Sequence, residues 1–136
     1  MSINRQTAHT IIDGALAHAG ELGLRITVAV VDAGGLLKAL DRMDGAPPLS
    51  AQIAEAKAQG AAVWHRDGHV LAEVQADREA FVAAVSEMTR LPLIPAGGSL
   101  CIRDADGNVT GAVGVSGGTP DQDRECAQKG LDAVSG

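Results

Sequence analysis

The histidine best placed for chemistry is His18, because it stands at helical spacing from several apolar residues. At about 100° per residue it falls on one stripe with Ile11, Ala15 and Leu22. An imidazole on the apolar side of a helix could ligate a metal ion or the metal of a bound cofactor. The position equally suits a core or interface histidine whose ring the protein hydrogen-bonds. His9 falls on the opposite side and is expected to face solvent.

A second group of candidates surrounds the single tryptophan, Trp64. His65 and His69 are four residues apart, a spacing that holds zinc when both side chains lie on one helix. Asp67-Gly68 between them favours a turn, and no third ligand is near in sequence, so the wall of a ligand pocket is the better prediction. Arg66, beside an aromatic, could instead clamp an anionic substrate.

Two glycine pairs could offer backbone N–H groups to a carboxylate. Gly117 and Gly118 lead into a helix whose free amides and dipole could hold the carboxylate of a cofactor or of an acid substrate. Gly97 and Gly98 can be interpreted in the same way. The alternative is that these glycines only turn the chain.

Acid–base chemistry has its own candidates. The charged residues nearest a predicted hairpin are Asp32, Arg42, Asp44 and Lys57. Carboxylates beside a base could move protons on a small organic acid, with His65 and Arg66 as further candidates. Surface salt bridges would explain the same charges.

The composition limits the class of protein. The chain has 136 residues, 46% of them hydrophobic, which fits a single domain over residues 1–136. A formal net charge of −6 without a Lys/Arg run argues against nucleic-acid binding. Its apolar runs are far shorter than the ~20 residues of a membrane span. The polar start, Met1–Thr10, lacks a leader pattern, so a cytoplasmic protein is expected.

The side chains available for the core are small. Phe81 and Trp64 are the only aromatic residues, and such a domain often gains stability by burying more surface in an oligomer. Cys101 and Cys126 are expected to be reduced and buried. Neither stands in a Cys-x-x-Cys-His setting, which excludes covalent c-type haem.

Periodicity predicts the elements of the first half. A helix is expected over Arg5–Leu22, followed by a strand over Arg25–Asp32 that is apolar on both faces, as in a sheet interior. Leu36–Arg42 should complete a hairpin. A second helix should start at a Ser50 cap and run to Val63.

The second half is predicted to return to strands before a final helix. A short helix should follow Gly68, and Asp77 should cap a third helix with an apolar face of Phe81, Ala84, Val85 and Met88. Leu100–Arg103 and Asn108–Val115 should pair across the turn Asp104–Gly107. The last helix has a capping box of Thr119 and Gln122, with Pro120 at its first position.

Three stretches stand out together: Val28–Gly35 running on to Arg42–Gly45, Gly111–Gly118, and Pro120–Asp123. Combined, they resemble the GlcG/HbpS-like haem-binding family, whose domain also forms the C-terminal part of PduO-type proteins. The resemblance covers nearly the whole chain. It implies an α/β (α+β) fold, a profilin-like three-layer sandwich with a five-stranded, mostly antiparallel sheet flanked by helices, and assembly into homo-oligomers, often octamers.

The resemblance also implies a ligand. Several members bind haem, and a histidine in the first helix is thought to ligate it in at least one appended domain, which points to His18. One departure is clear: Val63–Asp67 stands where the family commonly has a Phe-Gly-Arg-Pro-Thr-like turn. Contacts made from that turn therefore do not carry over.

The leading hypothesis is non-covalent binding of haem or a related tetrapyrrole by an oligomeric cytoplasmic protein, in haem handling or redox sensing. It places His18, or a histidine near Trp64, on the iron, and the glycine pairs at the propionates. The alternative is an enzyme of small-molecule catabolism that acts on an organic acid without haem. A third hypothesis is a structural or sensory subunit with a decayed ligand site.

Overall fold

The computed structural model describes residues 1–91 and 93–135 of the chain. This part contains five helices and four strands. Their bounds are α1 (Arg5–Glu21), β1 (Thr27–Asp32), β2 (Leu37–Arg42), α2 (Leu49–Trp64), α3 (Gly68–Asp77), α4 (Glu79–Met88), β3 (Ser99–Arg103), β4 (Val109–Ser116) and α5 (Pro120–Ser135). None of these helices has the length and apolar run that crossing a bilayer requires.

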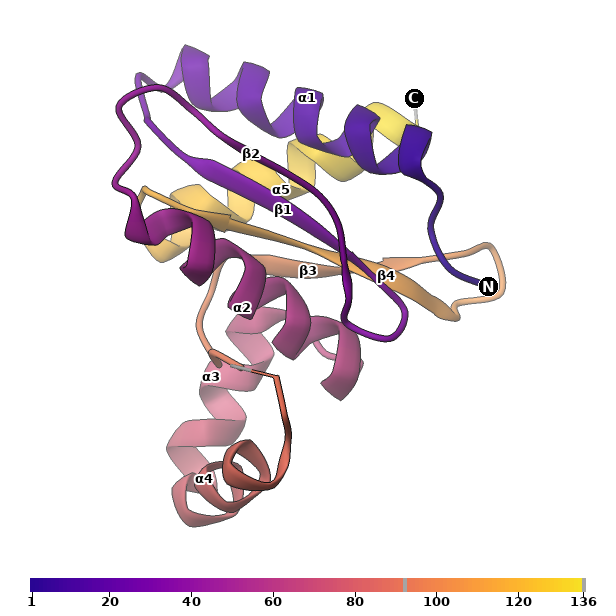
Figure 1. Cartoon of the computed structure of the whole chain (residues 1–136), viewed down its shortest axis with the longest axis vertical. Coiled ribbons are helices and arrows are strands. Elements are labelled where there is room, and N and C mark those ends of the chain that lie inside the picture. The colour runs from indigo at the N-terminus through magenta and orange to yellow at the C-terminus, as the bar shows by residue number, and fades with distance from the viewer. Residues whose placement is uncertain (92, 136) are drawn as a thin grey trace.

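The sheet is the middle of three layers (Figure 1). Its strands are antiparallel in the order β2-β1-β4-β3. α1 and α5 pack side by side on one face, and α2 lies against β1 and β4 on the other. α3 and α4 project beyond α2, away from the sheet. The predicted arrangement of helices flanking an antiparallel sheet is confirmed.

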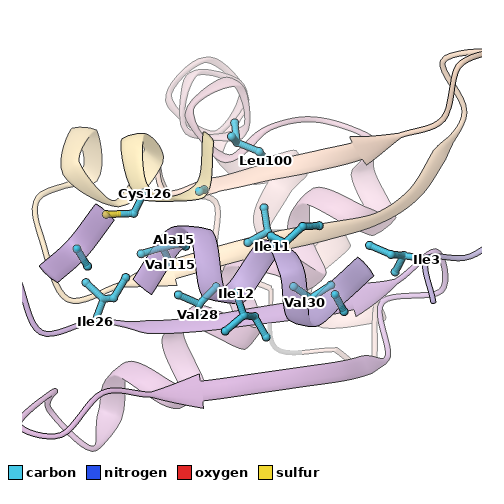
Figure 2. Close-up of a cluster of buried hydrophobic side chains, with 14 residues drawn as sticks. Ile3, Ile11, Ile12, Ala15, Ile26, Val28, Val30, Leu100, Val115 and Cys126 are labelled. Atoms are coloured by element: carbon cyan, nitrogen blue, oxygen red, sulfur yellow. The ribbon is translucent and has the colours of Figure 1, made fainter. Parts of the chain in front are cut away.

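β1 is buried on both faces because α1 covers one face and α2 covers the other. Val28 and Val30 point toward α1, where they meet Ile11 and Ile12 in the main core (Figure 2). Val31 points the other way, into a smaller cluster beneath α2. Side chains that alternate between two apolar layers explain why this strand has no polar face.

The layers approach closely because glycine stands where they touch. A Cβ added to Gly114 of β4 would collide with the carbonyl oxygen of Ala54 in α2, and would lie 2.7 Å from Ala58 N. A Cβ at Gly130 of α5 would lie 2.9 Å from Ile11 Cγ2 in α1. The predicted small-residue core is therefore a set of close backbone contacts.

The described residues form four strands, not the five that the resemblance implies. The stretch between α4 and β3 makes local backbone bonds instead of a ladder, from Leu93 N to Leu91 O (2.9 Å) and from Ala96 N to Ile94 O (3.1 Å). Pro95 also lacks the N–H that a ladder position needs. This stretch runs along α2, where Ile94 passes close to Gly60.

Two predicted caps are wrong. Ser50 lies inside the first turn of α2, which follows Pro48, and its hydroxyl bonds to the carbonyl oxygen of Pro47 (2.6 Å) and lies 2.7 Å from Thr27 Oγ1 of β1. Asp77 ends α3, and α4 begins at Glu79. A cap residue bonds to amides of its own helix, whereas Ser50 is recruited by a strand far away in the sequence.

The apolar face predicted for the third helix is mostly outside the core. In α4 only Val82 is buried, while Phe81 is 44% and Met88 80% exposed. By contrast, α5 begins as predicted: Thr119 Oγ1 accepts from Gln122 N (3.2 Å), and Gln122 Oε1 accepts from Thr119 N (3.0 Å). The short helix expected after Gly68 is also present, as α3.

Lys57 of α2 and Asp123 of α5 form a buried ion pair at the end of β4. Lys57 Nζ lies 3.2 Å from Asp123 Oδ2 and donates to the carbonyl oxygen of Val115 at 3.0 Å. The two side chains are 8% and 3% exposed. Burial raises the pKa of the Asp123 carboxyl above its ordinary value, and the Gly118 N–H and Lys57 oppose that rise. The pair ties together helices from opposite faces of the sheet.

We expect Gly114→Ala to destabilise the fold, because its Cβ would push α2 away from β4. Overpacking of this kind costs about 1–3 kcal/mol, so the urea midpoint of unfolding should fall. Gly20→Ala is the control: nothing lies within 4 Å of its added Cβ on α1. That variant should gain up to about 1 kcal/mol of helix stability, and equal losses in both variants would contradict close packing of α2.

Lys57→Met should lower the free energy of unfolding by about 3–5 kcal/mol, because it leaves the Asp123 carboxylate buried without its cation. The double variant Lys57→Met/Asp123→Leu should regain much of that loss, since no charge stays buried. Thermal unfolding of the two variants measures the difference, with exposed Lys38→Met of β2 as the control. A Lys57→Met variant as stable as Lys38→Met would show that the pair contributes nothing.

Candidate functional site

His18 lies near the end of α1, at the seam with α5. Its Nε2 is 2.8 Å from Glu125 Oε2 of α5, and its Nδ1 is 3.4 Å from Glu21 Oε2 of the same helix. The side chain is 15% exposed, so it borders the apolar stripe where Ala15 and Ala19 are fully buried. Both ring nitrogens therefore face carboxylates, as expected of an interface histidine, whereas a metal-ligating histidine keeps one nitrogen for the metal and hydrogen-bonds the other.

A hollow of about 270 Å³ opens beside this imidazole. Its lining residues are Gly14, Ala17, His18, Glu21 and Lys129. Gly14 has a structural reason to be small, because an added Cβ would lie 2.9 Å from Ala133 Cβ and 3.1 Å from the Lys129 carbonyl oxygen. Gly14 and Ala17 thus form the apolar part of the hollow, and the imidazole of His18, the carboxylate of Glu21 and the ammonium of Lys129 lie around it.

Glu21, Glu125 and Lys129 were not among the candidates from sequence. Glu125 meets His18 across 107 positions of the chain, and that pairing follows from how α1 packs on α5. Glu125 and Lys129 are four apart on α5, so they share one side of that helix. Helical spacing could have predicted that these two residues share a side of α5, but not that this side faces His18.

The two glycine pairs come together, although not around an open pocket. The carbonyl oxygen of Gly98 accepts from Val115 N (2.8 Å), and a Cβ on Gly97 would lie 3.2 Å from Pro120. Gly98 and Gly117 have φ of +116° and +138°, which favours glycine. They pack around the buried Lys57–Asp123 pair.

The amides of this junction have partners of their own. Gly118 N donates to Asp123 Oδ1 at 2.8 Å, and Thr119 N donates to Gln122. These bonds agree with the turn-forming alternative for the glycines. A propionate contact at Gly97, Gly98, Gly117 or Gly118 stays a prediction.

Trp64 and His65 lie at the end of α2, on the other side of the sheet from His18. Trp64 packs edge to face on Phe81 of α4, with ring centroids 6.2 Å apart. His65 is exposed with φ +56°, and its carbonyl oxygen accepts from Arg103 at 3.2 Å. The fold of one chain thus does not bring Trp64 or His65 to the His18 hollow.

The acid–base candidates are dispersed. Asp32 accepts from the amides of Gly34 (2.9 Å) and Leu36 (3.0 Å), which shapes the hairpin turn. Arg42 pairs with Thr27 at the other end of β1 and donates to the Ala46 carbonyl oxygen at 2.9 Å.

The remaining acid–base candidates do not join Asp32 either. Asp44 and Arg66 are exposed, and Lys57 is held in its buried pair. The described residues hold no group of three His, Cys, Asp or Glu side chains placed to bind a metal ion.

Both cysteines are free and buried. Burial, with help from Asp67, raises the pKa of the Cys101 thiol to about 11. Burial, with help from Asp123 and Glu125, raises that of Cys126 to about 11. Such thiols stay protonated at neutral pH and are poor nucleophiles and metal ligands.

The sequence is similar to those of known proteins over most of its length. The family described as haem-degrading protein HbpS-like matches residues 3–132. Protein GlcG of Escherichia coli (strain K12) is 37% identical over 117 residues, which cover 84% of this chain and 81% of GlcG. Corrinoid adenosyltransferase PduO of Citrobacter freundii is 28% identical over 135 residues, which cover 99% of this chain but 40% of PduO.

Solved structures share the fold. The crystal structure of Klebsiella pneumoniae protein ORFY is similar with a TM-score of 0.87 and 31% identity, over 98% of this chain and 90% of that one. The structure titled PduOC:Heme complex is similar with a TM-score of 0.86 and 26% identity, over 98% and 95% of the two chains. The resemblance drawn from the three sequence stretches is confirmed, and the chain belongs to the HbpS-like family of haem-degrading proteins.

Proposed function

We propose that this protein binds haem, or a related tetrapyrrole, non-covalently, with His18 as the iron ligand. The observation that carries the proposal is the position of the imidazole, held between two carboxylates at the rim of a hollow with small walls. A solved relative in complex with haem supports the same ligand class. When bound, haem would supply a redox-active iron.

The surroundings of His18 fit a ligating histidine. Such a residue usually gives one ring nitrogen to the metal and hydrogen-bonds the other to a carboxylate, which fixes the ring and raises its basicity. Here Glu21 and Glu125 stand at the two nitrogens. Either carboxylate can orient the ring while the other nitrogen is released to the iron.

The walls of the hollow fit a flat, anionic ligand. Gly14 and Ala17 present little side chain beside the imidazole, so a flat ligand could lie against this side of α1. Lys129 supplies an ammonium group on the same rim, and charge-assisted bonds to a carboxylate are among the stronger hydrogen bonds. We assign Lys129 to a propionate, whereas the Gly118 amide predicted for the same role would first have to leave Asp123 Oδ1.

We also propose that the protein is a homo-oligomer, that the oligomer is an octamer, that the protein is cytoplasmic, and that it acts in haem handling or redox sensing. Trp64 and His65 can reach a haem on His18 only from another copy of the chain, because they lie across the sheet within one copy. The organic-acid enzyme gains no support from geometry, since Asp32 ends β1 whereas Arg42, in β2, pairs with Thr27 at the other end of that strand.

His18→Ala should abolish saturable hemin binding or shift the Soret band, because it removes the iron ligand. Titration of the purified protein with hemin, followed by absorbance, measures both the affinity and the spectrum. His9→Ala, on the same helix, is the control and should bind as the unaltered protein does. Binding that is unchanged in His18→Ala would move the ligand to His65 or His69, and no saturable binding by any variant would refute the proposal.

Lys129→Ala should weaken hemin binding about tenfold, which corresponds to ~1.4 kcal/mol and lies near the low end for bonds to charged groups. The loss should disappear when hemin dimethyl ester replaces hemin, because the ester has no propionate charge. Lys38→Ala on β2 is the matched control. An equal loss with both ligands would show that Lys129 acts through packing.

A further inference from the structure

The bond between His18 and Glu125 occupies the tip of the imidazole ring. Nε2 of His18, on α1, donates to Oε2 of Glu125, on α5, at 2.8 Å. That distance is typical of a hydrogen bond to a charged group. An ionised carboxylate only accepts hydrogen bonds, so Nε2 carries a hydrogen in the ligand-free protein. A ring nitrogen in that state has no lone pair to offer to a metal.

Glu21 holds the other ring nitrogen less closely. Its Oε2 lies 3.4 Å from Nδ1 of His18, beyond the about 3.2 Å within which most N–H···O bonds fall. The Glu21 side chain is 76% exposed, against 54% for Glu125, and Glu21 is the last residue of α1. A small movement in water would therefore bring this carboxylate to hydrogen-bonding distance of Nδ1.

Nε2 is the ring nitrogen that a flat macrocycle can reach. Nδ1 lies beside the ring carbon that is bonded to Cβ, so a tetrapyrrole on Nδ1 would press against α1. Nε2 lies at the far end of the ring and points to α5, whose Lys129 also lines the hollow. Glu125 and Lys129 are four residues apart and share one side of α5. Nε2 and the hollow thus lie along the same seam, where α1 and α5 run side by side in Figure 1.

We propose that Glu125 is an internal competitor of the haem iron for Nε2 of His18. In the ligand-free protein the carboxylate of Glu125 holds this nitrogen. On binding, Nε2 gives its hydrogen to water and ligates the iron, and the half-exposed Glu125 side chain turns into solvent. Nδ1, which then carries the hydrogen of the neutral ring, donates to Glu21, as a metal-ligating histidine donates to a carboxylate. The inference rests on the haem binding proposed above.

The two carboxylates should therefore change hemin affinity in opposite directions. Glu125→Ala should tighten binding about threefold to tenfold, because the ligand-free protein no longer has a half-exposed bond to break. Glu21→Ala should weaken binding about tenfold, because the ligating ring loses its orienting partner. Asp13→Ala is the matched control: it removes an exposed negative charge from α1 and should bind hemin as the unaltered protein does.

Stability and redox potential separate competition from a purely structural role. Glu125→Ala should lower the thermal midpoint of the ligand-free protein while it tightens hemin binding, because the bond that it removes joins α1 to α5. A residue that only supported the site would lower both quantities. Glu21→Ala should raise the midpoint potential of the bound haem, because an imidazole without its carboxylate partner donates less electron density to the iron.

Hemin titration of the unaltered protein and the three variants decides the proposal. Binding by Glu125→Ala that is no tighter than binding by Asp13→Ala would overturn the competitor and leave the haem site standing. No saturable binding by the unaltered protein would refute the haem site and the competitor together. Long-range proton–nitrogen NMR of the ligand-free protein needs no haem: it should find the hydrogen on Nε2 of His18, and a hydrogen on Nδ1 alone would overturn the proposal.

Discussion

The buried ion pair of Lys57 and Asp123 holds the three layers in register. α2 lies on one face of the sheet and α5 on the other, and these two side chains meet past the end of β4. Asp123 also accepts from Gly118, and Lys57 donates to Val115, so the strand end and the start of α5 are fixed together. Both glycine-rich turns then fold around the pair, because a side chain at Gly98 would lie 3.0 Å from Lys57 Nζ.

The position of α5 in turn sets the geometry around His18. α5 starts at the junction just described, and Glu125 comes two residues after Asp123. Asp123 turns inward to Lys57, while Glu125 turns outward to the imidazole on α1. Close contact at Gly14 and Gly130 brings α1 near enough for that bond to form. The packing that fixes α5 in the interior thus also places Glu125 beside His18 at the surface.

Sequence patterns predicted the features that depend on local chemistry. The capping box of Thr119 and Gln122, the hairpin at Asp104–Gly107 and the two-sided burial of β1 all follow from residues close together in the chain. Contacts between segments far apart in the sequence were not predicted, such as those of Ser50 with Thr27 and of His18 with Glu125. The apolar stripe of α4 was recognised, but its exposure was not, because a hydrophobic pattern shows that a face avoids water and not what covers it.

The sheet separates the His18 hollow, on the face covered by α1 and α5, from α2 on the other face. Four strands and their close-packed glycines stand between them, so a ligand in the hollow need not disturb α2. Where one chain alone holds the haem, loading would be non-cooperative, with a Hill coefficient near one, and a partly filled sample would be a mixture of independent occupied and vacant copies.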